Sequence, residues 1–360
     1  MRKIFVFISI FTIVVACWRC QPSKQRDNVS ELTQTNKEII IAYKAPCFTD
    51  KRHVSIQVLN DQYLFRYAHH PFILDSLLIV GDMNEKANIC IFNRYTGKLI
   101  KAFGNTGNGP RELITPMEFS VDKDKGNLYV NDYGKKSILK YDLKNWDKTT
   151  VPSYLEIKLN SSIGDRSHIL YVKDSLFIAK DLFNRFILGT PNETIQEIKT
   201  QTPDPDIFKT QDDWYAFTNS YSCDAIAPSG EKYVSATLFG GILEIYNIKG
   251  KNIQMPLYRY FYKPILQKKG SVYNPTEETI YGFCHLHATD NYLYATVHGK
   301  KNPTSMPTAI WKFDWEGNPI TEYQCDNTPI ESFTVDEEKN KIYVIAYNPE
   351  GEQILGEINL

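Results

Sequence analysis

An internal repeat constrains the fold of this chain more than any other feature of its sequence. Residues 119–122 read Phe-Ser-Val-Asp and residues 333–336 read Phe-Thr-Val-Asp, and each segment is followed, after five residues, by an apolar-aromatic run. The same pair of short strands, separated by turn residues, recurs four more times. The equivalent positions of the second strand are Leu78, Leu128, Leu176, Tyr233, Leu293 and Ile342, at intervals of 50, 48, 57, 60 and 49 residues.

A third apolar segment follows in most repeats and ends in an aromatic residue next to Asn or Asp. Turns that contain Gly or Asn, such as residues 95–98 and 248–251, then lead toward a fourth strand. Beyond the apolar N-terminal segment, no helical periodicity of useful length is found. The aromatic pairs are Phe92-Asn93, Tyr141-Asp142, Tyr246-Asn247 and Phe313-Asp314.

Six repeats of four antiparallel strands each predict an all-β chain that folds as a six-bladed β-propeller. A β-sandwich is the alternative fold, and six copies in register argue against it. The sixth repeat reaches only its third strand, residues 353–360, where the sequence ends. We therefore expect the alternating segment 53–65 to supply the missing fourth strand and to close the ring.

Composition narrows the classes of function. The 41 Lys and Arg residues nearly balance the 42 Asp and Glu residues, so the chain lacks the strong positive field on which nucleic-acid binding depends. A hydrophobic content of 42% and a charged content of 23% exclude a disordered chain and a polytopic membrane protein. The sequence therefore predicts a globular protein with no nucleic-acid partner.

The N-terminal segment predicts export. Met1, Arg2 and Lys3 precede a twelve-residue apolar run, residues 4–15, which is too short to span a bilayer but has the length of a signal-peptide core. The next segment, Val-Val-Ala-Cys at 14–17, resembles a bacterial lipobox. This resemblance implies cleavage after residue 16 and acylation of Cys17, which would supply the several acyl chains that stable anchoring requires.

The cleaved chain is expected to have two parts. Residues 17–37 are polar and predict a flexible tether, and residues 38–360 predict the propeller domain. No acidic run follows Cys17, and we expect a lipid-anchored protein of the outer membrane that faces the periplasm. The seven cysteines have long, irregular spacings that match neither a zinc site nor a compact disulfide framework. Cys90 is interpreted as a small buried apolar residue.

One loop carries a more specific likeness. Residues 103–113 read Phe-Gly-Asn-Thr-Gly-Asn-Gly-Pro-Arg-Glu-Leu, and Pro116 opens the next inner strand. With the lipobox and the six repeats, this loop resembles that of the TolB-like or NHL-like six-bladed propeller lipoproteins of Bacteroidetes, which typically reads Gly-x-Gly-Pro-Gly-Glu-Phe/Leu. Arg111 replaces the second Gly of the Gly-Pro-Gly step that the family usually has. The resemblance implies fold and location, and it implies little about chemistry.

In a propeller, the first strand of each blade lines a central channel, so polar residues on these strands are candidates for function. His285 and His287 have the i, i+2 spacing that places both rings on one face of a strand, and imidazole is a common metal ligand. The alternative is a water-filled channel with hydrogen-bonded histidines, and the spacing fixes no third ligand. The channel candidates are Glu118, His168, Asp224, His285 and His287, with His69 and His70 in the approach to the first blade.

The loops between second and third strands share one face with the loops that connect successive blades, and ligands often bind at such loops. An aspartate at the end of a second strand has the alternative role of capping a turn. The guanidinium of Arg185 suits a carboxylate or a phosphate. The predicted partner-binding residues on this face are Asp82, Asp132, Asp181, Arg185 and His298, together with Arg111 and Glu112.

The chain contains no Gly-x-Ser-x-Gly elbow, no phosphate-binding glycine loop before a helix and no His-Glu-x-x-His motif, so no catalytic residues are predicted. The leading hypothesis is a membrane-tethered binding module, without a cofactor, for a protein, peptide or glycan of the cell envelope. The alternative is a hydrolase or lyase that acts at the channel mouth, with or without a divalent metal.

Overall fold

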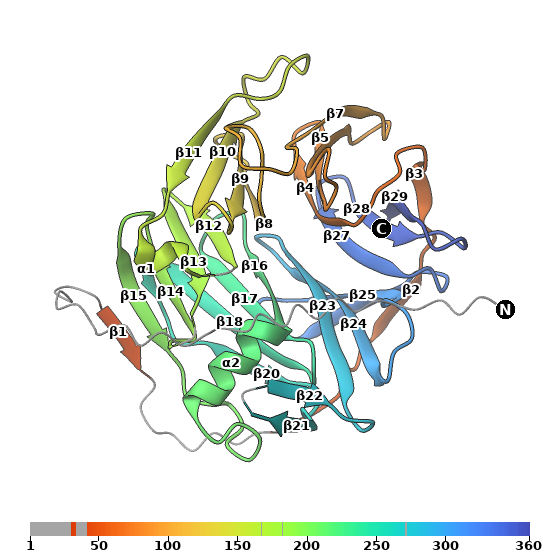
Figure 1. The fold of residues 1–360 in the computed structure, drawn as a ribbon. Helices are drawn as coiled ribbons and strands as arrows, with labels where there is room; N and C mark the ends of the chain where they lie inside the picture. Colours follow the sequence, from red (N-terminus) through yellow and green to blue (C-terminus); the bar gives the residue numbers. More distant parts are fainter. Residues whose placement is uncertain (1–29, 34–41, 167, 182, 271) are drawn as a thin grey trace.

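The computed structural model describes residues 30–33, 42–166, 168–181, 183–270 and 272–360. Six antiparallel sheets are arranged as blades around a common axis, with the first strand of each blade innermost (Figure 1). The predicted all-β, six-bladed propeller is confirmed.

In each of the first three blades, the strands follow one another along the chain from the axis outward. Blade 1 comprises β4 (Ala68–Leu74), β5 (Leu77–Asp82), β6 (Ile89–Asn93) and β7 (Leu99–Phe103). Blade 2 comprises β8 (Pro116–Asp122), β9 (Asn127–Asp132), β10 (Ser137–Asp142) and β11 (Tyr154–Lys158). Blade 3 comprises β12 (Ile169–Lys173), β13 (Leu176–Lys180), β14 (Phe186–Gly189) and β15 (Thr194–Lys199).

The last three blades repeat this order. Blade 4 comprises β16 (Ser222–Ile226), β17 (Lys232–Thr237), β18 (Ile242–Lys249) and β20 (Leu257–Tyr260), and β19 (Asn252–Ile253) pairs with the end of β18. Blade 5 comprises β23 (Ile280–Ala288), β24 (Leu293–Lys301), β25 (Ala309–Phe313) and β26 (Pro319–Gln324). Blade 6 comprises β27 (Ile330–Asp336), β28 (Lys341–Tyr347) and β29 (Gln353–Asn359), completed by β3 (Gln57–Asn60).

The second strand of each blade carries the repeat because both of its faces are buried. All six residues of β5 are buried, and so are all six of β9, since each blade is covered on both sides by its neighbours. The six equivalent positions predicted from the repeat fall on the first or second residue of β5, β9, β13, β17, β24 and β28. Continuous apolar runs are expected where a strand is buried on both faces.

The ring closes at the segment predicted from the sequence, although over a shorter stretch. β3 pairs antiparallel with β29, with Val58 opposite Gly356. The start of the predicted segment belongs to another sheet: β2 (Asp50–His53) pairs in parallel with β26 and adds a fifth strand to blade 5. Residues 54–56 connect the two sheets. The N-terminal part of the domain therefore holds two neighbouring blades, and only β3 completes the sixth.

Two insertions depart from the repeat. α2 (Gln211–Tyr221) lies between blades 3 and 4, and the hairpin of β21 (Leu266–Lys269) and β22 (Val272–Pro275) lies between blades 4 and 5. The hydrophobic periodicity of the sequence did not reveal α2, which has 11 residues. The sequence contains a local signal, because Thr210 and Asp213 form a capping box at the start of α2. Buried aromatic side chains such as Trp214 and Phe217 then hold the helix against the ring of blades.

The remaining elements are short. α1 (Ser161–Gly164) precedes blade 3, and β1 (Ser30–Thr33) pairs in parallel with β15. β1 falls within the segment predicted as a tether. The predicted leader and the acylation site Cys17 lie outside the described residues. In the part of the chain that the structure describes, no helix is long and apolar enough to cross a membrane.

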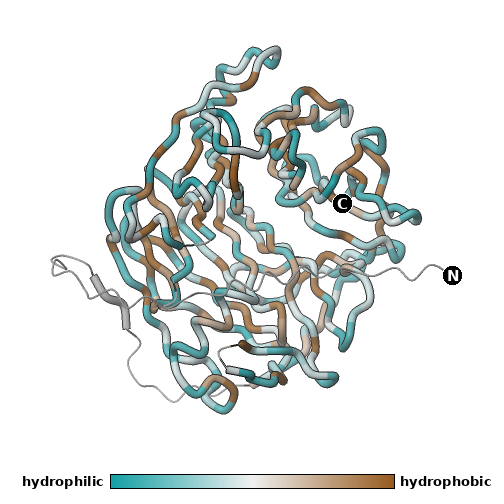
Figure 2. The backbone as a smooth tube through the Cα atoms, viewed as in Figure 1, coloured by the Kyte–Doolittle hydropathy of each residue, from teal (hydrophilic) through white to brown (hydrophobic). Residues whose placement is uncertain are grey.

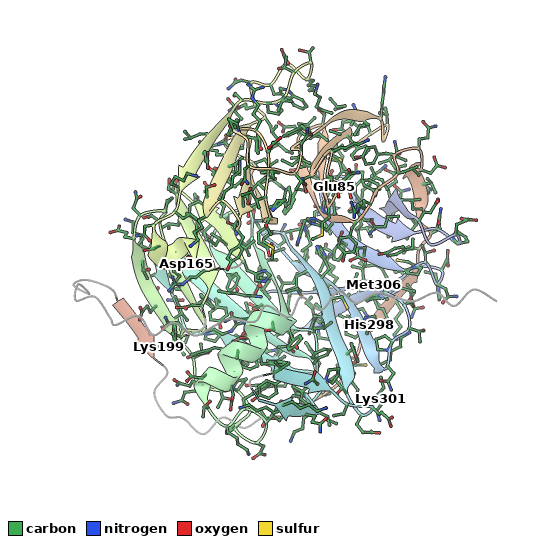
Figure 3. All side chains as sticks on the ribbon, viewed as in Figure 1. Glu85, Asp165, Lys199, His298, Lys301 and Met306 are labelled. Atoms are coloured by element: carbon green, nitrogen blue, oxygen red, sulfur yellow. The ribbon has the colours of Figure 1, made fainter. Side chains whose placement is uncertain are left out.

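The core is divided among the interfaces between blades. Figure 2 shows hydrophobic backbone positions concentrated in the strands and hydrophilic positions in the loops, and Figure 3 shows side chains filling the space between neighbouring sheets. Aromatic residues supply much of this packing, as where Phe186 meets Tyr233 and Tyr246 between blades 3 and 4. Cys90 is fully buried in blade 1, as interpreted from the sequence. The abundance of Tyr and Phe therefore serves blade packing.

Candidate functional site

The inner strands bring a carboxylate and several histidines together at the channel. Glu118 of β8 accepts a hydrogen bond from Nδ1 of His168, which precedes β12, over 2.5 Å. The other oxygen of Glu118 lies 3.9 Å from Nε2 of His70 on β4. The ring of His70 in turn lies 6.1 Å from that of His285 on β23. Four of the predicted channel residues are thus neighbours although they come from four different blades.

The backbone is irregular at the same positions. His70 and His168 have φ angles of 46° and 51°, in the left-handed region that side chains other than glycine rarely adopt. The ladders are also shifted next to these residues, in β4 after His69 and in β8 before Glu118. Bulges re-aim side chains, and a left-handed conformation is retained only where the surrounding structure imposes it. The backbone therefore directs His70, Glu118 and His168 toward one another.

Burial and hydrogen bonding oppose each other at Glu118. Burial by itself would raise the pKa of its carboxyl group, but the hydrogen bond from His168 and the nearby His70 and Lys180 lower that pKa to about 2. The carboxylate is therefore ionised at neutral pH and can only accept hydrogen bonds. Nδ1 of His168 must then be the donor, which fixes the tautomer of that ring when it is neutral.

His285 and His287 lie on one face of β23, as predicted, and the rings of both pack near Phe333. Burial lowers the pKa of His287 to about 3 and lowers the pKa of His285 well below its usual value. Within the described residues, no three or more His, Cys, Asp or Glu side chains are placed to hold a metal ion together. We derive no chemistry from a metal at His285 and His287.

Asp224 and Arg185 are paired within the protein. Asp224 forms an ion pair of 2.5 Å with Lys180 and accepts a hydrogen bond from the Tyr233 hydroxyl group. Arg185 was expected at the channel mouth, but its side chain is fully buried between blades 3 and 4, with Glu244 at 2.5 Å. Both ion pairs join blade 3 to blade 4. Arg185 is therefore not placed to meet a partner in solution.

Asp82 and Asp132 have the same structural role in successive blades. Asp82, at the end of β5, accepts a hydrogen bond of 2.8 Å from the backbone NH of Tyr67, which precedes β4. Asp132, at the end of β9, accepts one of 2.8 Å from the backbone NH of Ile114, which precedes β8. Each buried carboxylate thus holds the loop that enters its own blade. The alternative role of capping a turn accounts for both residues.

The other residues predicted for this face have separate surroundings. Asp181 accepts hydrogen bonds from Arg166 and Asn184, and Glu112 accepts one from the backbone NH of Gly109 within its own loop. Arg111 is exposed and lines a shallow cleft of about 420 Å³ beside residues 145–154 of blade 2. His298 lies on blade 5, away from these loops. The predicted residues therefore do not form one site.

A set of exposed apolar side chains on this face was not predicted from the sequence. Because Asp82 and Asp132 turn inward, the residues that follow them, Met83 and Tyr133, project into solvent. The loops that carry them are held to the adjoining loops by backbone hydrogen bonds, as between Met83 and Tyr67. The sequence does contain a signal for Met83 and Tyr133, because each directly follows an aspartate at the end of a second strand. We call the set the loop-face cluster: Tyr67 (42% exposed), Met83 (52%), Ile114 (36%), Tyr133 (37%) and Phe183 (80%).

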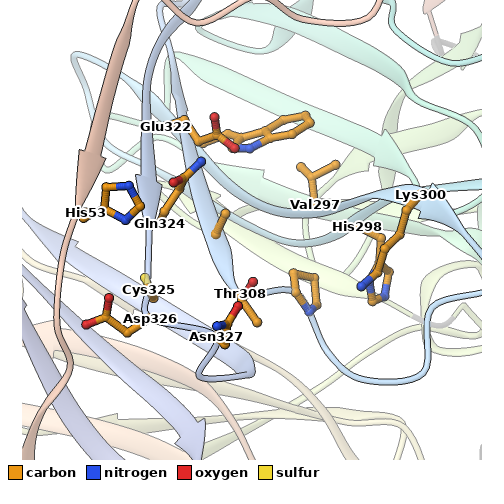
Figure 4. A pocket seen from close by; sticks show the side chains of 13 residues that line it. His53, Val297, His298, Lys300, Thr308, Glu322, Gln324, Cys325, Asp326 and Asn327 are labelled. Carbon is orange, nitrogen blue, oxygen red and sulfur yellow. The ribbon is translucent and has the colours of Figure 1, made fainter.

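His298 lines a separate cleft, which we call the blade-5 cleft. Its volume is about 550 Å³, and it lies where β24, β25, β26 and β2 meet. Figure 4 shows His53, Glu322 and Gln324 on one side, His298 and Lys300 on the other, and Thr308 and Asn327 between them. Burial, followed by the charge of Lys300, lowers the pKa of His298 to about 4. This imidazole is therefore neutral at physiological pH.

Comparison with solved structures shows the same fold in two Bacteroides proteins. A putative exported protein from Bacteroides fragilis is similar with a TM-score of 0.54 and 16% identity, over 86% of this chain and 98% of that one. A member of the DUF4221 family from Bacteroides vulgatus has a TM-score of 0.52 and 11% identity, over 85% of this chain and 96% of that one. No curated protein matches the sequence.

The family model with the description "TolB-like 6-blade propeller-like" matches residues 47–338, which is most of the chain and includes all of blades 1–5. The match agrees with the six sheets, the closing strand and the loop of residues 103–113. The chain belongs to the TolB-like six-bladed propeller family.

Proposed function

We propose that this protein is an exported, lipid-anchored propeller that binds a protein partner of the cell envelope through its loop-face cluster. The leader of residues 1–16 and the lipobox cysteine, Cys17, support export and anchoring. The similar fold of a Bacteroides protein described as a putative exported protein agrees with this location. The anchor would hold the domain near the membrane, facing the periplasm.

The exposed apolar side chains of the loop-face cluster carry this proposal. Large apolar residues are most often buried, whereas these five are exposed on loops of three successive blades. Exposed apolar patches are typical of interaction sites. Tyr and Met are also enriched in the cores of protein interfaces. Exposed basic residues, among them Arg66 and Arg111, lie on the same loops and would form part of a polar rim. This composition favours a protein surface as the partner.

A capture experiment tests the proposal with matched variants. The domain is immobilised, exposed to envelope extract and compared with Phe183→Ser and Tyr133→Ser. The matched control is Leu155→Ser, because Leu155 is 59% exposed but lies on the outermost strand of blade 2. We expect the same specific proteins to be lost with both loop-face variants and retained with the control. Equal capture by all four proteins would overturn the proposal.

One observation favours a second candidate, a hydrolase or lyase that acts in the channel. Glu118 holds His168 through Nδ1, and this pairing leaves Nε2 to act on a substrate, as in a carboxylate-histidine pair that performs general base catalysis. A panel of chromogenic ester, amide and glycoside substrates tests it. An activity that falls at least about 100-fold in His168→Gln and is unaffected in Leu155→Ser would support an enzyme. Turnover that persists in His168→Gln would exclude this pair as its centre.

A further inference from the structure

The blade-5 cleft is built from strands whose register directs alternate side chains to one face. His53 of β2 is paired with Gln324 of β26, and Trp311 of β25 is paired with Glu322. Glu322 and Gln324 are two residues apart, so their side chains point to the same face of the sheet. The cleft thus combines the edge strand β2 with the outer half of blade 5. It shares no residue with the loop-face cluster.

The charges of the cleft are balanced. Glu322 is paired with Lys51 of β2 at 2.9 Å. Lys300 and Asp326 contribute one charge of each sign. Burial keeps the His298 ring neutral at physiological pH, because its pKa is about 4. A ligand with a strong net charge of either sign would therefore find no complementary field in this cleft.

The remaining polar groups both donate and accept hydrogen bonds. The amides of Gln324 and Asn327, the hydroxyl group of Thr308 and the neutral imidazole of His298 all have this property. A sugar hydroxyl group likewise donates one hydrogen bond and accepts others. The lining is therefore suited to a ligand that carries many hydroxyl groups and no charge.

Two buried polar atoms of the cleft residues lack a partner among the described residues. They are Nδ1 of His298 and Nε1 of Trp311, whose side chain is only 7% exposed. Most buried polar atoms in proteins are hydrogen-bonded, so an unpaired atom calls for an explanation. Both atoms are shielded from solvent, so ligand hydroxyl groups would satisfy them only after a small movement of the two side chains.

The backbone around the cleft is held in an uncommon conformation. Asp326 and Asn327 are consecutive residues with φ angles of 35° and 60°, in a turn closed by a hydrogen bond of 2.7 Å from the NH of Thr328 to the carbonyl oxygen of Cys325. Asn and Asp tolerate the left-handed region better than other non-glycine residues. The turn fixes the direction from which Asn327 faces the cleft.

From these observations we propose that the blade-5 cleft binds an uncharged saccharide, with Gln324, Asn327 and His298 as its hydrogen-bonding residues and Trp311 as an apolar wall. The volume of about 550 Å³ lies within the range of small-molecule sites, roughly 300–1,000 Å³. Such a site would give the propeller a glycan ligand in addition to the protein partner proposed above, and the two sites would act independently.

Binding to a panel of saccharides tests the proposal. The panel comprises neutral hexose disaccharides and trisaccharides, uronic-acid oligomers and amino-sugar oligomers, and the strongest neutral binder is then measured by isothermal titration calorimetry. We expect a neutral member to bind. We expect Gln324→Ala and Asn327→Gly each to lower the affinity for it about tenfold. Glycine at 327 accommodates the positive φ, so this variant removes the amide without straining the turn.

The control for these variants is Gln267→Ala, which removes an exposed glutamine from the β21–β22 hairpin. This control should bind the saccharide with the affinity of the unaltered protein. All variants should have the melting temperature of the unaltered protein. The proposal is overturned if no neutral saccharide binds, if charged members bind more tightly, or if both cleft variants bind normally. Phe183→Ser should retain saccharide binding, which separates this result from that of the capture experiment.

Discussion

At the scale of single residues, most of the charged groups predicted to meet a partner are instead paired within the fold. Arg185 is fully buried, donates to Glu244 through Nε and Nη2, and also contacts Ser235 at 2.6 Å. Desolvation of such a pair offsets much of its attraction, so its loss matters chiefly through the charge that remains unpaired. The same reasoning applies to the buried carboxylates at the ends of second strands.

Removing one member of the buried ion pair should therefore destabilise the protein strongly. We expect Arg185→Leu to lower the free energy of unfolding by about 3–5 kcal/mol, because Glu244 is left buried without a partner. The double variant Arg185→Leu with Glu244→Leu should recover part of that loss. Urea denaturation measures both. The control is Arg66→Leu, an exposed arginine for which a change within about 0.5 kcal/mol is expected. A similar small change in Arg185→Leu would contradict the interpretation.

The cap at the end of β9 gives a second prediction at this scale. Asp132→Ala should lower the free energy of unfolding by about 1–3 kcal/mol, because the backbone NH groups of Ile114 and Thr115 lose their acceptor. Asp124→Ala, at an exposed position in the same blade, should have almost no effect. If Asp132 served only to bind a partner, both variants would be equally stable.

At the scale of elements, the inner strands and the closing strand have different tasks. The inner strands hold histidines in neutral form within the channel, where burial lowers the pKa of His69 and of His287 to about 3 each. The closing strand β3 contributes little apolar burial of its own but completes blade 6 across the two ends of the domain. The burial of neutral histidines should make stability depend on pH, and the closing role of β3 should make stability depend on that strand.

Stability should fall as the pH is lowered from about 6.5 toward 3. In this range the unfolded state binds protons at its histidines while His69, His287 and His298 resist protonation in the folded state. The free energy of unfolding is therefore unaffected by these histidines above pH 6.5 and decreases progressively below it. Melting temperatures measured from pH 7 to pH 4 should decrease, and the decrease should be smaller in His287→Phe if that variant folds normally. A flat profile would contradict the burial of these rings.

Replacing β3 should destabilise the whole domain. We expect substitution of Gln57–Asn60 by Gly-Ser-Gly-Ser to lower the melting temperature by several degrees in one cooperative transition, because blade 6 loses its fourth strand. The matched control replaces Asp50–His53, which only adds a fifth strand to a complete blade 5, and its effect should be smaller. Equal melting temperatures for the two variants would contradict closure by β3.

At the scale of the whole molecule, the proposed location of the propeller rests on the acylation of Cys17. If Cys17 is the lipid-bearing residue, radiolabelled palmitate should be incorporated into the natural protein and not into Cys17→Ser. Cys20→Ser, which removes a neighbouring cysteine, should remain labelled. Labelling of the Cys17→Ser protein would show that the lipid is attached at another residue, and absence of label from the natural protein would show that the chain carries none.

The sequence alone determined the fold, because the blade repeat is local. Each second strand is a short apolar run followed by turn residues, and six such units with one strand missing from the last indicate a closed propeller before any contact is known. The pairing of polar groups was decided only by the tertiary structure. Arg185 and Glu244 are 59 residues apart, and Glu118 meets His70 and His168 from two other blades. No local pattern records such a meeting, because whether a charge is buried and paired or free on a surface depends on how neighbouring blades pack.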